Sequence, residues 1–487
     1  MTRSEEPPGT ADTAEYDVVV IGAGPVGENV AERAHAAGLS ALVVESELVG
    51  GECSYWACMP SKALLRPVAA LADVRRVAGA AQAVAGGLDA SAVLERRDGF
   101  TSHWQDKGQV DWLASAGLDL MRGRARLDGP RRVVVDTPEE GTRTVLARHA
   151  VAVCTGSRAA VPSLPGIEEA RPWTSREATS AKEVPGRLAV VGGGVVAAEM
   201  ATVWRALGSE VTVLVRGEGL LQRMEPFAGE LVAEALEAAG ATVRTNVQVD
   251  ALERPDPRGP VALSLSDGGR LEADEVLFAT GRAPRTADLG LETVGLRDGQ
   301  WLGADDTCRV EGVQGGWLYA VGDANGRNLL THQGKYQARV AGSAIGARAA
   351  GVPLLETDPW GAHAATADHR AVPQVVFTDP EAASVGLTKA EAEGRGLRVR
   401  AVDVEMGEVA GAALYADGYR GRARMVVDLD RDVMVGATLV GPGVSELLHA
   451  ATVAVAGEVP LERLWHAVPS YPAMSEVWLR LLEKHRG

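Results

Sequence analysis

Cysteine is scarce in this sequence, with four in 487 residues. So few cysteines exclude a small secreted fold that is held together by disulfides. No stretch approaches the roughly 20 apolar residues that a membrane-spanning helix needs, so we expect no membrane partner. Basic residues are also few, because 49 Lys and Arg face 65 Asp and Glu, for a formal net charge of −16. This charge argues against a nucleic-acid partner, since binding to a phosphate backbone requires a basic face.

The first 15 residues are polar and acidic and lack the apolar core of a signal peptide. We therefore expect residues 1–15 to form a disordered N-terminus and the protein to be cytoplasmic. The remaining composition, 46% hydrophobic and 23% charged, is that of an ordinary globular protein. The length implies roughly two to four domains.

Two of the four cysteines, Cys53 and Cys58, are separated by four residues and followed by the helix-opening Pro60-Ser61-Lys62. A thiol near a helix N-terminus is favoured as thiolate, so this spacing indicates a pair that cycles between dithiol and disulfide. The alternatives are a structural disulfide or half of a zinc site. Zinc would need a second pair of ligands at similar spacing, and Cys154 and Cys308 stand alone, so we expect no metal.

A dinucleotide-binding pattern precedes this pair. Tyr16–Ile21 reads as a buried strand and is followed by a glycine-rich turn, an alanine-rich helix to His35 and a second strand at Ala41–Glu45. The turn has the G-x-G-x-x-G spacing through Gly22, Gly24 and Gly27. Glycines at these positions let the backbone approach a pyrophosphate, and Glu45 ends the next strand where a carboxylate would bind an adenosine ribose.

The pattern recurs at residues 187–215. A strand at Leu188–Val191 leads into a turn and a helix, and a second strand runs over Glu210–Val215. The residues of this turn with the fingerprint spacing are Gly192, Gly194 and Ala197. Val215 stands where a ribose-binding carboxylate would be, and Arg216 follows it, with Arg223 as a second candidate contact. Arginine in place of a carboxylate suits a 2′-phosphate, so the pattern favours NADPH, with NADH as the alternative. Arg216 could instead be a solvated surface charge.

Further motifs complete a family pattern. Gly50-Gly51-Glu52-Cys53 through Cys58-Met59-Pro60-Ser61-Lys62 has the form of a redox-disulfide signature. Residues 154–157, with Thr155 and Gly156, and residues 279–282, with Gly281 and Arg282, have the form of two A-T-G turns. Residues 319–323, with Gly322 and Asp323, have the form of a second FAD motif. Together they resemble the class I pyridine nucleotide–disulfide oxidoreductases, the family of glutathione reductase, dihydrolipoamide dehydrogenase and mercuric reductase.

The resemblance implies an α/β fold with two Rossmann-like domains, for FAD and NAD(P), and a C-terminal α/β dimerisation domain. The domain limits that it implies are 16–165 and 281–350 for FAD, 166–280 for NAD(P)H and 351–487 for the interface. It also implies a homodimer whose active sites are shared across the interface.

The resemblance assigns roles to the redox residues. Cys58 would lie beside the flavin and Cys53 would attack the substrate, while Lys62 and Glu199 match an ion pair near the reactive nitrogen of the flavin. Electrons would pass from NADPH through FAD to the Cys53–Cys58 disulfide and then to a small-molecule disulfide. Gly51, Thr155, Gly156, Gly322, Asp323, Gly281 and Arg282 would belong to the cofactor sites.

One position departs from the family pattern. Members generally carry His-Pro-Thr-x-x-Glu near the C-terminus, where the histidine exchanges protons with the substrate-attacking thiol. Here Tyr471 replaces the histidine, while Pro472 and Glu476 are in register. Tyrosine, with an ordinary pKa of about 10, is a poor proton shuttle at neutral pH, and His466 lies five residues upstream. The alternatives to disulfide reduction are therefore an NAD(P)H quinone reductase or diaphorase, or a specialised enzyme of the 2-ketopropyl-coenzyme M oxidoreductase/carboxylase kind.

Overall fold

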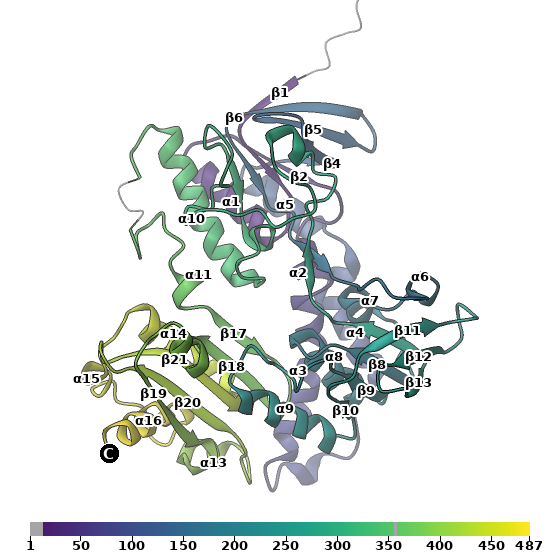
Figure 1. The fold of residues 1–487 in the computed structure, drawn as a ribbon, viewed down its shortest axis with the longest axis vertical. Coiled ribbons are helices and arrows are strands. Elements are labelled where there is room, and N and C mark those ends of the chain that lie inside the picture. The colour runs from purple at the N-terminus through teal and green to yellow at the C-terminus, as the bar shows by residue number, and fades with distance from the viewer. Residues whose placement is uncertain (1–12, 355–357) are drawn as a thin grey trace, which may run out of the picture. The chain divides into compact units, whose positions relative to one another are not determined.

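The computed structural model describes residues 13–354 and 358–487, which form two compact units (Figure 1). The first unit comprises residues 13–55, 104–158 and 282–368, and the second comprises residues 56–103, 159–281 and 369–487. Residues 1–12 of the predicted disordered N-terminus lie outside the described residues.

The first unit is built on a seven-stranded sheet in the order β3-β2-β1-β6-β5-β4, with β16 paired to β6. The strands are β1 (Thr13–Ile21), β2 (Ala41–Glu45), β3 (Asp119–Arg122), β4 (Arg124–Leu127), β5 (Arg132–Thr137), β6 (Gly141–Val153) and β16 (Leu318–Ala320). β3, β2, β1, β6 and β16 pair in parallel, whereas β4 and β5 are antiparallel additions. β1 starts three residues before the strand expected from the sequence, because Thr13–Tyr16 pair with β6.

The central strands are apolar on both faces because both faces are covered. Val18 and Val20 pack into one core cluster, whereas Val19 and Ile21 pack into another, as the two-residue period of a strand requires. One face is covered by α1 (Pro25–Ala36) and α10 (Thr331–Ala349), which lie side by side (Figure 1). Glycine allows their close approach, since a Cβ at Gly342 would lie 2.4 Å from the Cβ of Arg33.

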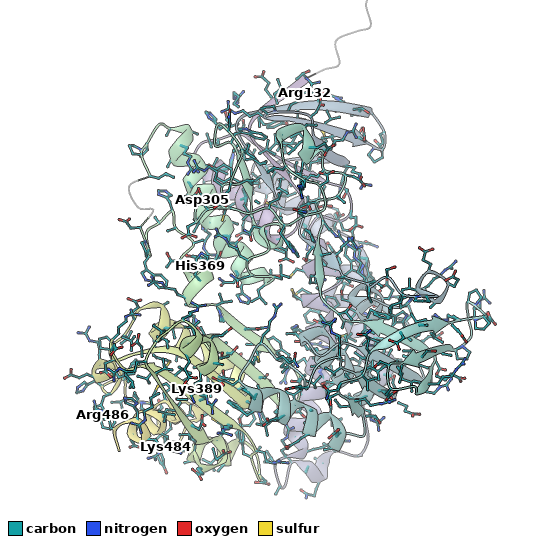
Figure 2. The ribbon with its side chains drawn as sticks, viewed as in Figure 1. Arg132, Asp305, His369, Lys389, Lys484 and Arg486 are labelled. Atoms are coloured by element: carbon teal, nitrogen blue, oxygen red, sulfur yellow. The ribbon has the colours of Figure 1, made fainter. Side chains whose placement is uncertain are left out.

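The first unit also contains several short elements, among them α2 (Gly51–Tyr55), α5 (Lys107–Ser115) and β15 (Arg282–Pro284). Arg132, at the start of β5, pairs with Asp128 at the surface of this unit (Figure 2).

The second unit contains three sheets. A parallel sheet has the order β10-β9-β8-β14, a small antiparallel sheet the order β11-β12-β13, and a larger antiparallel sheet the order β17-β18-β21-β20-β19. The parallel strands are β8 (Arg187–Val191), β9 (Glu210–Leu214), β10 (Thr242–Arg244) and β14 (Glu275–Phe278). The antiparallel strands are β11 (Val249–Glu253), β12 (Val261–Leu265), β13 (Arg270–Ala273), β17 (Pro373–Val376), β18 (Glu381–Gly386), β19 (Val399–Glu405), β20 (Arg422–Asp428) and β21 (Val433–Gly441).

A continuous core joins the parts of the second unit that matter for the site. It contains Leu64 of α3 (Cys58–Arg75), Trp204 of α8 (Val195–Ala206), Phe227 of α9 (Pro226–Ala238) and Val376 at the end of β17. The other helices of this unit include α4 (Ala90–Phe100), α7 (Ser175–Ser180), α13 (Ala410–Tyr415), α14 (Leu448–Ala456) and α16 (Val477–Arg486). Packing against α4 and α8 therefore fixes the helix α3 that begins at Cys58.

Among the residues that the structure describes, no helix is long and apolar enough to cross a membrane. A search of the same residues finds no group of three or more His, Cys, Asp or Glu side chains that could hold a metal ion.

Candidate active site

In the turn after β1, steric contacts require glycine at two positions, Gly22 and Gly27, whereas the third, Gly24, has free space around it. Gly22 has a φ of +104°, and a Cβ there would lie 2.5 Å from the carbonyl oxygen of Cys154. A Cβ at Gly27 would lie 1.9 Å from the carbonyl oxygen of Gly22, so α1 can pack against the turn only without a side chain. Gly24, by contrast, has no atom within 4 Å of its Cβ position. A Cβ at Gly51 would lie 2.9 Å from the Cα of Gly24, so the start of α2 borders this opening.

Glu45 ends β2 next to this turn. Its buried carboxylate accepts hydrogen bonds from the backbone N–H groups of Ala23 and Glu47, both at 2.7 Å. The carboxylate is thus held at the C-terminal edge of the sheet, close to the N-terminus of α1. This edge is where an open α/β sheet binds its ligands.

A chain of polar side chains lies at the same edge of the first unit. The Ser157 hydroxyl donates to the Asp323 carboxylate, and the Arg282 guanidinium donates to the Ser157 hydroxyl at 2.8 Å. Burial raises the pKa of Asp323, which the Ser157 hydrogen bond partly opposes. The Thr155 hydroxyl is buried and has no hydrogen-bond partner among the described residues. Gly156 has a φ of +72°, which the turn between Thr155 and Ser157 requires. An orphaned hydroxyl beside an acid and an arginine fits a site for a polar cofactor.

Sequence reasoning did not single out Ser157 as a site residue. It is 3% exposed, and its hydroxyl joins two residues that are more than 100 positions away along the chain. Its place directly after Thr155 and Gly156 was the available signal.

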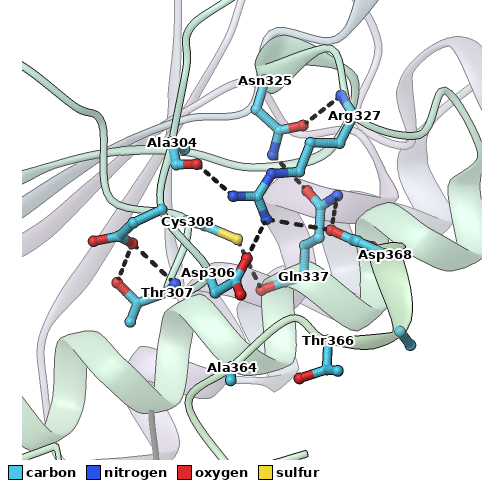
Figure 3. Close-up of polar contacts among 12 residues, drawn as sticks. Ala304, Asp306, Thr307, Cys308, Asn325, Arg327, Gln337, Ala364, Thr366 and Asp368 are labelled. Carbon is cyan, nitrogen blue, oxygen red and sulfur yellow. Dashed lines mark hydrogen bonds and ion pairs between the residues drawn. The ribbon is translucent and has the colours of Figure 1, made fainter. Parts of the chain in front are cut away.

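A buried hydrogen-bond network that includes Gln337 and Asp368 (Figure 3) contacts the turn that carries Gly322 and Asp323. The side-chain oxygen of Gln337 accepts from the Gly322 N–H at 2.8 Å and from Asn325 at 2.7 Å. The Gln337 amide nitrogen donates to Asp368 at 2.8 Å, and Arg327 approaches the same carboxylate at 3.5 Å. This network fixes the backbone of the turn at Gly322 and the side chain of Asn325.

The two thiols of the pair occupy different elements. Cys53 is in α2, and Cys58 is the first residue of α3, so its sulfur meets the positive end of that helix. Both are partly exposed. Cys154 and Cys308 are buried in the core of the first unit, and burial raises the pKa of both thiols far above the ordinary value. Only the first pair is therefore placed for thiolate chemistry.

Lys62 lies one helical turn after Cys58 on α3. Its ammonium contacts both carboxylate oxygens of Glu199, at 3.0 and 2.8 Å. The Glu199 side chain is 4% exposed and the Lys62 side chain 36%. Of the predicted catalytic residues, the structure brings this pair into direct contact, across 137 positions of the chain.

The second glycine turn repeats the geometry of the first within the second unit. Gly192 has a φ of +135°, and a Cβ there would lie 2.3 Å from the carbonyl oxygen of Ala279. Gly194 has no atom within 4 Å of its Cβ position, and Ala197 is fully buried in α8. Gly281 also has a positive φ, +131°. Arg216 and Arg223 are exposed after β9. Neither arginine forms an ion pair with any residue that the structure describes.

Comparison with known protein families shows to which family the chain belongs. The family model described as "Pyridine nucleotide-disulphide oxidoreductase" matches residues 16–346, and the one described as its dimerisation domain matches residues 372–481. The chain belongs to this family. The predicted family, fold class and enzyme class are thereby confirmed.

Curated relatives and solved structures agree with this assignment. The chain is 31% identical to a mercuric reductase from Staphylococcus aureus, over 95% of this chain and 81% of that one. It is 32% identical to a dihydrolipoyl dehydrogenase from Thermus scotoductus, over 95% of both chains. In structure it is similar to the HOCl-induced flavoprotein disulfide reductase RclA from Escherichia coli, with a TM-score of 0.80 and 23% identity over 96% and 99% of the two chains. LpdA from Mycobacterium tuberculosis also has a TM-score of 0.80 and 23% identity, over 97% and 99%. At that identity, the structural likeness shows the fold.

As a pyridine nucleotide-disulphide oxidoreductase, the protein is a flavoenzyme that uses FAD and a pyridine nucleotide, with Cys53 and Cys58 as its redox pair. The open Gly24 backbone and the orphaned Thr155 hydroxyl fit FAD in the first unit. The C-terminal domain is the dimerisation domain of the family.

The C-terminal segment carries Tyr471 at the position where the family resemblance implies a histidine. Tyr471 is 77% exposed in the isolated chain, and its hydroxyl makes no hydrogen bond to any described residue. Glu476 is 4% exposed, and one of its oxygens accepts from Arg480 at 2.5 Å. Its other oxygen, Oε2, is buried with no hydrogen-bond partner among the described residues. The glutamate thus forms an ion pair with arginine on its own helical turn. His466 lies after α15 (Leu461–Leu464), and its backbone N–H donates to Arg463.

Proposed function

We propose that this protein is an NADPH-dependent reductase of a small-molecule disulfide, with Cys53 and Cys58 as the thiols that turn over. The observation that carries the proposal is the spacing on α3. Cys58 and Lys62 are four residues apart and therefore lie on one face of the helix, and Glu199 holds the Lys62 ammonium. A thiol and a fixed cation are thus placed together at the start of one helix.

Different residues of the chain would bind the cofactor, stabilise charge and react with the substrate. Bound FAD supplies the two-electron relay between a nicotinamide and the thiols. In the proposal, Gly22, Gly24 and Gly27 hold its pyrophosphate and Glu45 its ribose, and Asp323 holds the region between ribityl chain and phosphate. Lys62 would supply a fixed positive charge near the ring of bound FAD, because a fixed cation acts strongly where water is excluded. Cys58 faces the cofactor, and Cys53 attacks the disulfide substrate.

The coenzyme in the proposal is NADPH. Arg216 and Arg223 are exposed in the segment that follows β9, and neither is neutralised by an ion pair within the described residues. Two such guanidinium groups suit a 2′-phosphate. NADPH carries this phosphate and NADH lacks it, so the two arginines would have no phosphate partner if NADH were bound. The proposed NADP(H) domain spans residues 166–280, within the FAD domain of residues 16–165 and 281–350.

The proposed enzyme is a homodimer. Residues 351–487 would form the interface domain, and Tyr471 of one protomer would complete the active site of its partner. The high exposure of Tyr471 in the single chain supports such a place, because a large aromatic side chain is usually covered.

The test uses the FAD-loaded enzyme under anaerobic conditions. One equivalent of NADPH should produce a long-wavelength band from charge transfer between the Cys58 thiolate and flavin, and Cys58→Ser should abolish it. Absence of the band in the wild-type enzyme would refute the proposal. Screening NADPH oxidation against a panel of disulfides and quinones would then identify the acceptor.

A quinone is the second candidate acceptor, and the C-terminal segment favours it. Reduction of a quinone needs no general base for thiol exchange. In this chain Tyr471 stands where such a base is expected, and Arg480 forms an ion pair with Glu476. Cys53→Ser separates the two functions. Disulfide turnover requires the Cys53 sulfur, whereas reduction of a quinone by the flavin should survive the substitution.

A further inference from the structure

We propose that Phe377 is a positioning residue for Lys62. In this proposal its ring and its backbone N–H hold the Lys62–Glu199 pair in place. The inference rests on the proposed role of Lys62 near the flavin and extends it to the segment that begins the dimerisation domain.

Phe377 contacts both members of the pair. The Lys62 Nζ lies over the Phe377 ring, 5.1 Å from its centroid. The Phe377 N–H donates to Glu199 Oε1 at 3.0 Å, and Lys62 Nζ contacts the same oxygen at 3.0 Å. One carboxylate oxygen therefore receives the lysine of α3 and the backbone of residue 377 together.

The ring supplies a restraint that the ion pair alone lacks. Lysine is a flexible chain that ends in a strongly hydrated charge, and a partly exposed ion pair restrains such a chain weakly. The Lys62 side chain is 36% exposed. An aromatic face within about 6 Å attracts the ammonium and removes some of its freedom to turn toward water. Glu199 and Phe377 thus hold the charge from two directions.

Phe377 is itself well anchored. It follows β17, and its ring packs against the core that contains Val376 and Leu64. Next to it, the Thr378 hydroxyl donates to the Pro380 carbonyl at 2.7 Å, and Asp379 pairs with Arg76 at the C-terminal end of α3. The turn at residues 377–380 therefore holds α3 at two points, through Lys62 and through Arg76.

The experiment measures the charge that the flavin senses. Sulfite adds to oxidised flavin as an anionic adduct, so its affinity for the FAD-loaded enzyme reports a fixed cation near the ring. Phe377→Leu should weaken sulfite binding by about fivefold to thirtyfold, the factor that corresponds to a partly desolvated cation–π contact. Phe377→Tyr keeps the aromatic face and should stay within about twofold of the wild type.

Two further variants make the result decisive. Phe227→Leu is the control, because Phe227 packs in the same core as Phe377 and lies under Arg422 and Arg424, but it does not contact Lys62. It should lower thermal stability and leave sulfite affinity unchanged. Lys62→Met tests the underlying role. If it leaves sulfite affinity unchanged, the proposed role of Lys62 fails. If Lys62→Met weakens sulfite binding and Phe377→Leu does not, the inference about Phe377 alone is overturned.

Discussion

The side chain of Gln337 ties the buried carboxylate of Asp368 to the backbone of the Gly322 turn. Its Nε2 donates to Asp368 Oδ2 at 2.8 Å (Figure 3). Its Oε1 accepts from the Gly322 N–H, also at 2.8 Å. Gln333 donates to the other oxygen of Asp368 at 2.9 Å. A carboxylate near the end of the first unit thereby orients the amide that fixes a proposed FAD-binding turn.

We predict that Asp368→Asn destabilises the FAD-loaded enzyme by about 3 kcal/mol, because it places an amide N–H against buried donors and removes one of the two carboxylates, Asp306 and Asp368, that pair with Arg327. Urea unfolding should show this loss, and flavin fluorescence should show weaker retention of FAD. Asp128→Asn is the control, since Asp128 is half exposed and pairs with Arg132 at the surface. Equal effects of the two substitutions would contradict the proposed role of Asp368.

A second prediction concerns Glu28, in the first turn of α1. Burial raises the pKa of this carboxyl from 4.5 to about 7, which Lys335 opposes and Glu45 reinforces, and its Oε1 has no hydrogen-bond partner among the described residues. Below about pH 4.5 the group is protonated in both states, so it costs no stability. As the pH rises toward 7, the unfolded chain releases this proton before the folded one, and stability falls.

Glu28→Gln removes this titration. The variant should match the wild type near pH 4 and exceed it by up to about 3 kcal/mol near pH 8, the ceiling set by a shift of 4.5 to about 7. Unfolding by urea across this pH range provides the measurement. A difference between the two proteins that does not change with pH would show that Glu28 does not titrate in this way.

The coenzyme preference gives a third prediction. Arg216→Ala should raise the KM for NADPH by about tenfold to hundredfold, the range for a lost charge-assisted hydrogen bond, and should leave the KM for NADH nearly unchanged. Arg223→Ala should act in the same direction. Arg270→Ala is the control, because Arg270 is an exposed arginine of the same unit that pairs with Glu253. Parallel changes for both coenzymes after Arg216→Ala would exclude a 2′-phosphate contact.

The dinucleotide folds could be predicted from the sequence because their signals are local. The apolar run at Val18–Ile21, the glycine spacing after it and Glu45 at the end of the next strand lie within about 30 residues. Contacts such as Ser157 with Asp323, or Phe377 with Glu199, join segments that are more than 150 positions apart. Nothing in their local sequence specifies the partner, because the pairing depends on how the strands and helices pack.

The C-terminal segment shows the same limit at shorter range. The sequence contains Tyr471 where the family resemblance implies a histidine, and the four-residue spacing of Glu476 and Arg480 is that of a helical ion pair. Glu476 is buried, and only one of its oxygens has a partner among the described residues, because of how residues 474–486 pack. The ion pair could therefore be predicted from the sequence, whereas the burial of Glu476 could not.

The fourth prediction tests that departure directly. Tyr471→His should raise the rate of disulfide reduction by about tenfold or more, because an imidazole with an ordinary pKa near 6.5 exchanges protons with a thiol at neutral pH, and general acid–base catalysis contributes about 10²–10⁴. The unpartnered Oε2 of Glu476 is an acceptor that could orient the new ring.

Steady-state turnover with NADPH and a disulfide, measured across pH 5–9, should gain a limb near the histidine pKa. Quinone turnover, which needs no thiol base, should not change and serves as the internal control. Tyr471→Phe removes only the hydroxyl, so a loss of disulfide turnover in that variant, together with no gain in Tyr471→His, would show that the tyrosine itself serves the native substrate.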